Sequence, residues 1–240
     1  MNQITTMRLP DGAEVAFVDW SDKPLWSSVD LLSGFTDTEV NAFTYVVGDE
    51  VPATVNATVR RIASDRDTNV STPGSMASTE EMLVYAIKPE YNESRTADGN
   101  PTELDVLTYQ QQGQPIPRSN RLAILQDQLI LQLEVSQKIE HSAPLGYYNT
   151  GFGVLTSMQS TNATALSSRG TAGLPSQEAV RSLGIPVHIG GQEKYRVALV
   201  NAAAAAVPSG QNEATPPVND AQIVHTVRVY LDGLYKRPVS

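Results

Sequence analysis

The chain has 240 residues and no cysteine, and 18% of its residues are charged against 40% that are hydrophobic. This length suits one large domain, and the lack of thiols excludes disulfides and thiolate metal sites. Because 17 basic and 26 acidic residues give a formal charge of −9, the surface repels phosphates, and we expect no direct contact with nucleic acid.

Residues 1–40 are predicted to form an irregular N-terminal arm, followed by a single domain over residues 41–240. Met1–Asp19 lacks a basic start followed by an apolar run, so we expect no signal peptide. The chain's two tryptophans both lie in the arm, and aromatic anchors dominate many subunit contacts. We therefore predict a subunit interface that includes Trp20, Leu25, Trp26, Leu31 and Leu32.

After the arm, apolar and polar residues alternate with period two in several short runs, most clearly over Leu129–Val135 and Ile223–Leu231. Such alternation is typical of half-buried strands. Residues 121–126 fit a helical turn, and Asp232-Gly233 is predicted to turn the chain after the last strand. Strands are predicted at residues 43–47, 51–59, 80–87, 104–109, 129–135, 187–189, 195–199 and 223–231. A short helix is the alternative at residues 80–87, and continuation of the strand from 129 as far as 139 is left open. Polar loops are predicted at residues 65–78, 92–101, 110–120 and 208–217, a turn-rich aromatic stretch at 144–153, and an exposed excursion rich in Ser, Thr, Ala and Gly at 156–177.

These elements predict an all-β fold. Strands do not alternate with helices, which argues against a parallel α/β sheet, and no repeat of fixed period is visible. The longest apolar run, Val197–Val207, is interrupted by Asn201 and falls short of the roughly 20 residues that span a bilayer. We expect an antiparallel β-sandwich, built as a single jelly roll with long loops.

No motif in the sequence equips an active site. There is no G-x-S-x-G elbow, and Gly151-Phe-Gly153 lacks the remaining residues of a phosphate loop. His141, His188 and His225 are scattered, and His225 lies on the apolar face of a predicted strand, as a core or interface histidine would. We therefore expect no enzyme activity, no catalytic residue and no cofactor.

One short loop has the spacing of cation ligands. Asp65, Asp67 and Asn69 match the first three positions of a calcium loop, but Val70 and Met76 stand where such a loop needs Gly and Glu. The preferred alternative is a loop cap or an ion pair with Arg61 or Arg66, and the sequence leaves a bound cation open.

Three stretches resemble jelly-roll capsid proteins of tailless icosahedral bacteriophages. The resemblance rests on the layout of strands and turns rather than on a defining motif, and it covers about half of the chain. The stretches are Ala63–Tyr91, with Pro73-Gly74 before Glu80–Ile87; Leu129–Gly153, with the Ala143-Pro144-Leu145 turn; and the chain end, with Gly190–Leu199 and Val227–Pro238.

The resemblance implies an eight-stranded sandwich, self-association and a place in a virion after synthesis in the host cytoplasm. Its partners would be copies of itself and other virion proteins. Arg8 is the only basic residue before Lys23, so the arm would clamp a neighbouring subunit or face an internal membrane or scaffold instead of condensing a genome. The alternative is a monomeric β-sandwich that binds a carbohydrate or a receptor; an enzyme on a cupin-like jelly roll would need clustered histidines.

Overall fold

The computed structural model describes residues 6–8, 12, 14–16, 20–32, 34, 36–54, 60–97, 100–103, 124–148, 154–162, 165–172, 181–201, 205 and 223–236. The strand predicted at residues 104–109, the loops at 110–120 and 208–217, and the Gly151-Phe-Gly153 turn lie outside these residues. Within the described part, no helix is long and apolar enough to cross a membrane.

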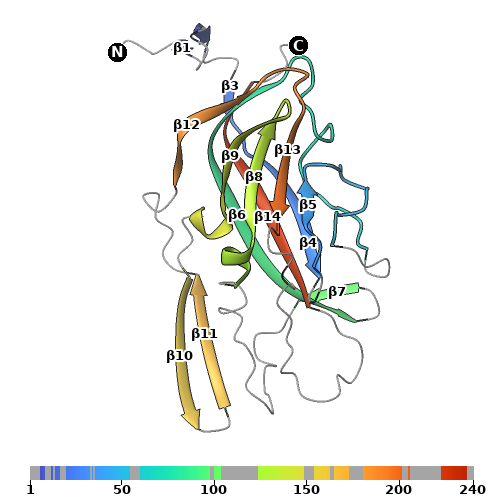
Figure 1. Ribbon diagram of the computed structural model, residues 1–240, viewed down its shortest axis with the longest axis vertical. Helices are drawn as coiled ribbons and strands as arrows, with labels where there is room; N and C mark the ends of the chain where they lie inside the picture. Colours follow the sequence, from blue (N-terminus) through green and yellow to red (C-terminus); the bar gives the residue numbers. More distant parts are fainter. Residues whose placement is uncertain are drawn as a thin grey trace.

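Two antiparallel sheets form the body of the protein (Figure 1). The first sheet has the order β12 (Ser182–Ile189), β6 (Glu81–Ala97), β14 (Ile223–Lys236) and β4 (Leu25–Leu32), with β3 (Trp20–Asp22) beside the end of β14 and β7 (Asn100–Glu103) beside β6. The second sheet has the order β5 (Glu39–Ala42), β13 (Tyr195–Val200), β8 (Ile130–Val135) and β9 (Lys138–Pro144).

Smaller elements complete the described structure. A 3-10 turn, η2 (Leu145–Tyr147), follows β9, and a helical turn covers residues 124–128, which confirms the helical turn predicted there. Two short ladders stand outside the main sheets: β1 (Thr6–Arg8) with β2 (Glu14–Ala16), and β10 (Val154–Asn162) with β11 (Ala165–Ala172).

The strand pairs are nested in the way that defines a jelly roll. Of the eight strands in the two four-stranded layers, the first pairs with the last, β4 with β14, and the second with the seventh, β5 with β13. The third pairs with the sixth, β6 with β12, and the fourth with the fifth, β8 with β9. The predicted all-β, antiparallel jelly-roll sandwich is therefore confirmed.

Alternating side chains from the two sheets fill one core. Leu131 and Leu133 of β8 and Val227 and Val229 of β14 are buried, while residues between them are half-buried. This is the period-two pattern expected of strands with one face toward a core. Burying each such side chain fully contributes roughly 1.5–3 kcal/mol, so the facing sheets are held mainly by this layer.

Several predicted elements differ from the observed ones. Residues 25–32 form the buried strand β4 and so belong to the jelly roll rather than to an irregular arm, and residues 39–42 form β5. Residues 43–47 form bends and turns instead of a strand, and Phe43 has a φ of 62°, which is not compatible with a strand. Residues 51–54 also form no strand, and 55–59 lie outside the described part.

Two places where the chain turns differ from the prediction. The strand from residue 129 does not continue to 139, because Ser136 and Gln137, both at positive φ, turn the chain between β8 and β9. Asp232-Gly233 does not turn the chain, since β14 continues to Lys236 against β6. Strand β6 likewise runs through most of the loop predicted at residues 92–101.

Gly233 is required by a close approach between β14 and β6. The register shifts there, with Asp232 opposite Ala86 and Gly233 opposite Val84, so Tyr85 is the extra residue of a bulge in β6. A Cβ atom on Gly233 would lie 2.0 Å from the carbonyl oxygen of Leu83, a distance that the backbone could relieve only by moving apart.

We expect Gly233→Ala to lower the free energy of unfolding by at least about 2 kcal/mol, because two central strands must separate to admit the methyl group. Gly184→Ala is the matched control, since a Cβ atom there meets nothing within 4 Å. Urea unfolding of both variants measures the difference. Equal effects of the two substitutions would contradict the close approach.

Candidate functional site

The β5–β6 connection (residues 43–80) covers the outer edge of β4. The backbone N–H groups of alternate residues in β4 point away from β14, and a strand in this position would otherwise offer them to another chain. Each of them donates to an acceptor on the connection. The acceptors are Asn69 Oδ1 for Trp26 at 2.8 Å, Tyr45 Oη for Ser28 at 3.0 Å, Pro52 O for Asp30 at 2.8 Å and Thr54 Oγ1 for Leu32 at 2.8 Å.

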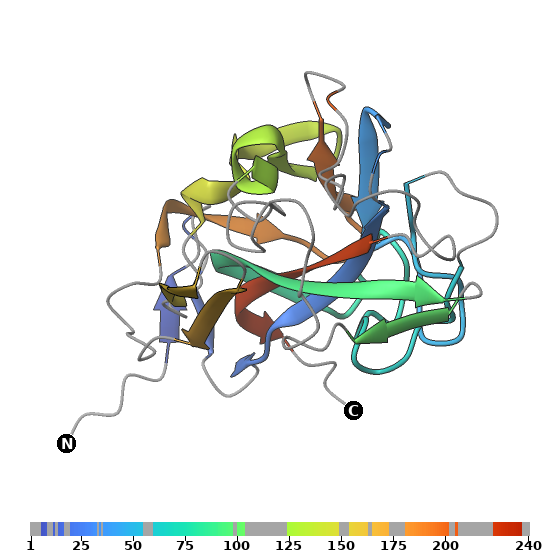
Figure 2. The same cartoon turned by 90° about the horizontal axis from the view of Figure 1, so that it is seen from below.

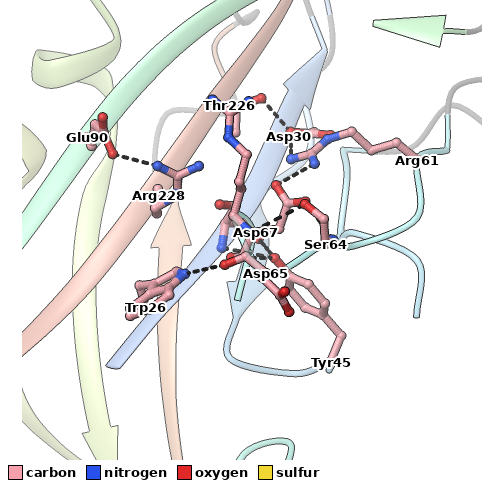
Figure 3. Close-up of polar contacts among 12 residues, drawn as sticks. Trp26, Asp30, Tyr45, Arg61, Ser64, Asp65, Asp67, Glu90, Thr226 and Arg228 are labelled. Atoms are coloured by element: carbon pink, nitrogen blue, oxygen red, sulfur yellow. Dashed lines mark hydrogen bonds and ion pairs between the residues drawn. The ribbon is translucent and has the colours of Figure 1, made fainter. Parts of the chain in front are cut away.

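A buried ion cluster fastens this connection to the strand (Figure 3). Arg61 lies between two carboxylates: Nε and Nη2 donate to the two oxygens of Asp30 at 2.6 and 3.1 Å, and Nη1 donates to Asp67 Oδ1 at 2.5 Å. The side chains of Asp30 and Asp67 are only 9% and 7% exposed, and that of Arg61 is 20% exposed. The cluster is therefore largely removed from water.

Both carboxylates also accept hydrogen bonds from groups other than Arg61. Thr226 Oγ1 on β14 donates to Asp30 Oδ1 at 2.7 Å, and the backbone N–H and hydroxyl of Ser64 donate to Asp67 Oδ2, both at 2.9 Å. Every carboxylate oxygen in the cluster thus has a donor. Such saturation is what allows buried charges to persist in a protein, and it suits a structural role better than proton transfer.

The cluster shifts the ionisation of its members in the directions that stabilise their charges. Burial disfavours the charged guanidinium, but hydrogen bonds and opposite charges from Asp30 and Asp67 outweigh it and raise the pKa of Arg61. Burial likewise raises the pKa of Asp67, but the backbone N–H of Ser64 and the guanidinium of Arg61 outweigh it, and the net pKa lies below the ordinary value.

The loop at residues 65–69 uses its polar groups internally. Asp67 forms the ion pair with Arg61 that the sequence offered as the alternative to a cation, and this alternative is confirmed. Asn69 accepts from the backbone N–H of Trp26 and donates to Pro24 O, while the backbone oxygen of Asp65 accepts from the Trp26 indole. Across the residues that the structure describes, no group of three or more candidate ligands is placed to hold a metal ion.

The three histidines occupy separate elements. His225 on β14 is 3% exposed, as predicted for a core position. His141 on β9 has Nδ1 2.7 Å from the Tyr148 hydroxyl, and burial together with the charge of Arg181 lowers its pKa. His188 on β12 has Nε2 3.3 Å from Glu81, which also binds Lys236. The structure does not gather them into one site.

The residues predicted as subunit-interface anchors lie inside the chain's own fold. Leu25, Leu31 and Leu32 are buried in β4, and Trp20 packs against Leu83 in a small cluster outside the main core. The chain's own residues thus cover these four side chains, and the predicted subunit interface stays a prediction. Trp26 is half-buried, and its ring centroid lies 6.2 Å from that of Tyr230.

The apolar surface that does reach solvent was missed in the sequence. Its members alternate with polar residues or stand alone in loops, so no sequence pattern separates them from core positions. The large apolar side chains exposed among the described residues are Val47, Ile62, Ile124, Ile139, Tyr147 and Ile185.

The two remaining long edge strands are poorly suited to pairing with another strand. In β9 the register shifts between Leu133 and Glu134 of its partner, and the strand ends at Pro144. In β12 the register shifts between Ser182 and Val187, and Pro186 within this stretch has no N–H to donate. Bulges and prolines at edges prevent strand addition, so contacts there must use side chains.

Comparisons with protein-family models, with curated proteins and with solved structures gave no match for this chain.

Replacing Arg61 by Met should lower the free energy of unfolding by about 3 kcal/mol, because two carboxylates would stay buried without their common partner. Arg60→Met is the matched control, because Arg60 is adjacent to Arg61 in the sequence but pairs with Glu50 at the surface, where both side chains are more than half exposed. The expected loss of unfolding free energy in this control is within about 0.5 kcal/mol. Urea unfolding at neutral pH compares them. If both variants lost the same stability, the cluster would not fasten the connection.

Asp67 should make a pH-dependent contribution to stability. Since its folded pKa lies below the unfolded value of about 3.9, its contribution is complete above that value and is lost as the pH falls through the folded pKa. The difference in unfolding free energy between the wild type and Asp67→Asn should therefore be constant above pH ~5 and shrink below pH ~4. A difference that stays constant down to pH ~2 would show that the carboxylate is not stabilised in the folded state.

Proposed function

We propose that this chain is a virion structural protein, a capsid protein that assembles with copies of itself into an icosahedral shell. The observation that carries the proposal is a jelly roll whose exposed large apolar side chains lie on the sides of the sandwich and in loops, including Ile62, Ile139 and Ile185. Jelly rolls serve as shell, lectin and cupin domains, so the fold supports the proposal by analogy, and the exposed apolar side chains offer contact surface for other copies.

The charged groups support a structural role in the same way. In the described part of the chain, the buried carboxylates Asp30 and Asp67 are fully engaged by Arg61, Thr226 and Ser64. An active site requires groups whose hydrogen-bonding capacity is left for a substrate. Saturated clusters instead rigidify a subunit, and rigid subunits lose little conformational entropy when they assemble.

Other virion proteins and location in the virion are part of the same proposal. Because the net charge is −9, we do not expect the protein to bind a genome through its phosphates. Strand β4 begins at Leu25 and is part of the sandwich, so an arm that clamps a neighbour would have to come from residues before β3 (Trp20–Asp22).

Light scattering and electron microscopy of the purified full-length protein test the proposal. We expect the weight-average mass to rise with concentration well beyond that of the 25.9 kDa chain, and closed particles to appear. A chain that stays monomeric at every concentration up to its solubility limit would contradict the proposal and favour the monomeric binding module.

A further inference from the structure

Five of the six large apolar side chains exposed among the described residues lie on or beside the strands that end the two sheets, and the sixth, Ile124, lies in the helical turn before β8. Strands β9 and β12 end the two sheets on one side, where Arg181, just before β12, lies 3.8 Å over the ring of Tyr147, just after β9. Strands β4 and β5 end them on the other side, where the backbone N–H of Phe43 donates to Ser27 Oγ. In Figures 1 and 2, β12 and the β5–β6 connection lie toward opposite margins of the sandwich.

The β9/β12 side carries exposed side chains on both of its edge strands. Ile139 on β9 is 51% exposed and Ile185 on β12 is 79% exposed, and Tyr147 is exposed between them in the chain. Arg181 lies over the Tyr147 ring on this side, and the opposite charges of Lys138 and Glu140 on β9 offset each other, so the guanidinium makes this side positive.

The β4/β5 side carries its apolar side chains on the β5–β6 connection. Val47 and Ile62 belong to two segments that are joined by the Glu50–Ile62 bridge and by the hydrogen bond from Gly48 N to Ala63 O. The same connection contains a small buried cluster of Tyr45, Val51 and Ala63. The chain from residue 37 to residue 67 has six acidic and three basic residues, so this side is negative.

The two sides are therefore apolar, opposite in position and opposite in charge. One molecule cannot bring its own two sides together, because the sandwich lies between them. A second copy can present the complementary side, and the contact then joins two different surfaces. Repetition of such a head-to-tail contact closes into a ring when the rotation between copies permits, as a symmetric shell requires.

We propose that the β9/β12 side of one copy, centred on Ile139 and Ile185, docks on the β4/β5 side of the next, centred on Val47 and Ile62. This inference rests on the proposed self-assembly and specifies its contact. The ion cluster at Arg61 acts on this contact as a support, since it holds the connection that carries Ile62 against the sandwich.

Two double variants test the contact by complementation. Val47→Gln with Ile62→Gln removes the apolar surface on one side, and Ile139→Gln with Ile185→Gln removes it on the other. All four side chains are between 47% and 79% exposed, so folding should be unaffected, which circular dichroism and urea unfolding verify. The measurement is sedimentation velocity of each variant alone and of an equimolar mixture.

We expect each variant alone to lose self-association at least tenfold and to sediment as a monomer at a concentration where the wild type assembles. The mixture should form a two-chain species and nothing larger, because each variant keeps one intact side. A dimer formed by one variant alone, a mixture that stays monomeric, or variants that assemble like the wild type would each overturn the head-to-tail contact. A wild type that never associates would instead contradict the proposed self-assembly itself.

Discussion

The closed outer edge of the jelly roll's first strand depends on one interaction, the ion cluster in which Arg61 joins Asp30 and Asp67. Strand β4 is the first strand of the jelly roll, and its outer edge would be open without the β5–β6 connection. That connection has little regular structure of its own, so hydrogen bonds and ion pairs must hold it in place. Because Thr226 of β14 also donates to Asp30, the cluster ties the connection to two neighbouring strands at once.

Closing that edge determines how the protein can meet other molecules. Connection residues occupy the edge of β4, β5 is only four residues long, and β9 and β12 are interrupted by register shifts and carry a proline. Edges treated in this way do not add strands readily, which protects the protein from edge-to-edge aggregation. Association must then rely on exposed side chains. The proposed shell contact uses such side chains on the β9/β12 and β4/β5 sides.

The sequence predicted the strands that have one polar face but not those covered on both. β8 and β14 alternate cleanly because only one face of each meets the core. β4 shows no alternation, because all of its last six residues are buried, by the core on one face and by the connection on the edge and the other face. The sequence therefore predicts an irregular arm where the structure has a strand. The sequence predicts only part of the ion cluster. The Asp67–Arg61 pair is local in the sequence, whereas Asp30 is 31 residues from Arg61 and Thr226 is much farther along the chain.

Hydrogen exchange of the β4 backbone tests the central claim most directly. If the Arg61 cluster holds the connection over the edge, the amides of Trp26, Ser28, Asp30 and Leu32 should exchange slowly in the wild type and much faster in Arg61→Met. The alternate amides of β4, which face β14, should remain protected in both proteins. Rapid exchange at those four amides in the wild type, or no change in the variant, would contradict the account.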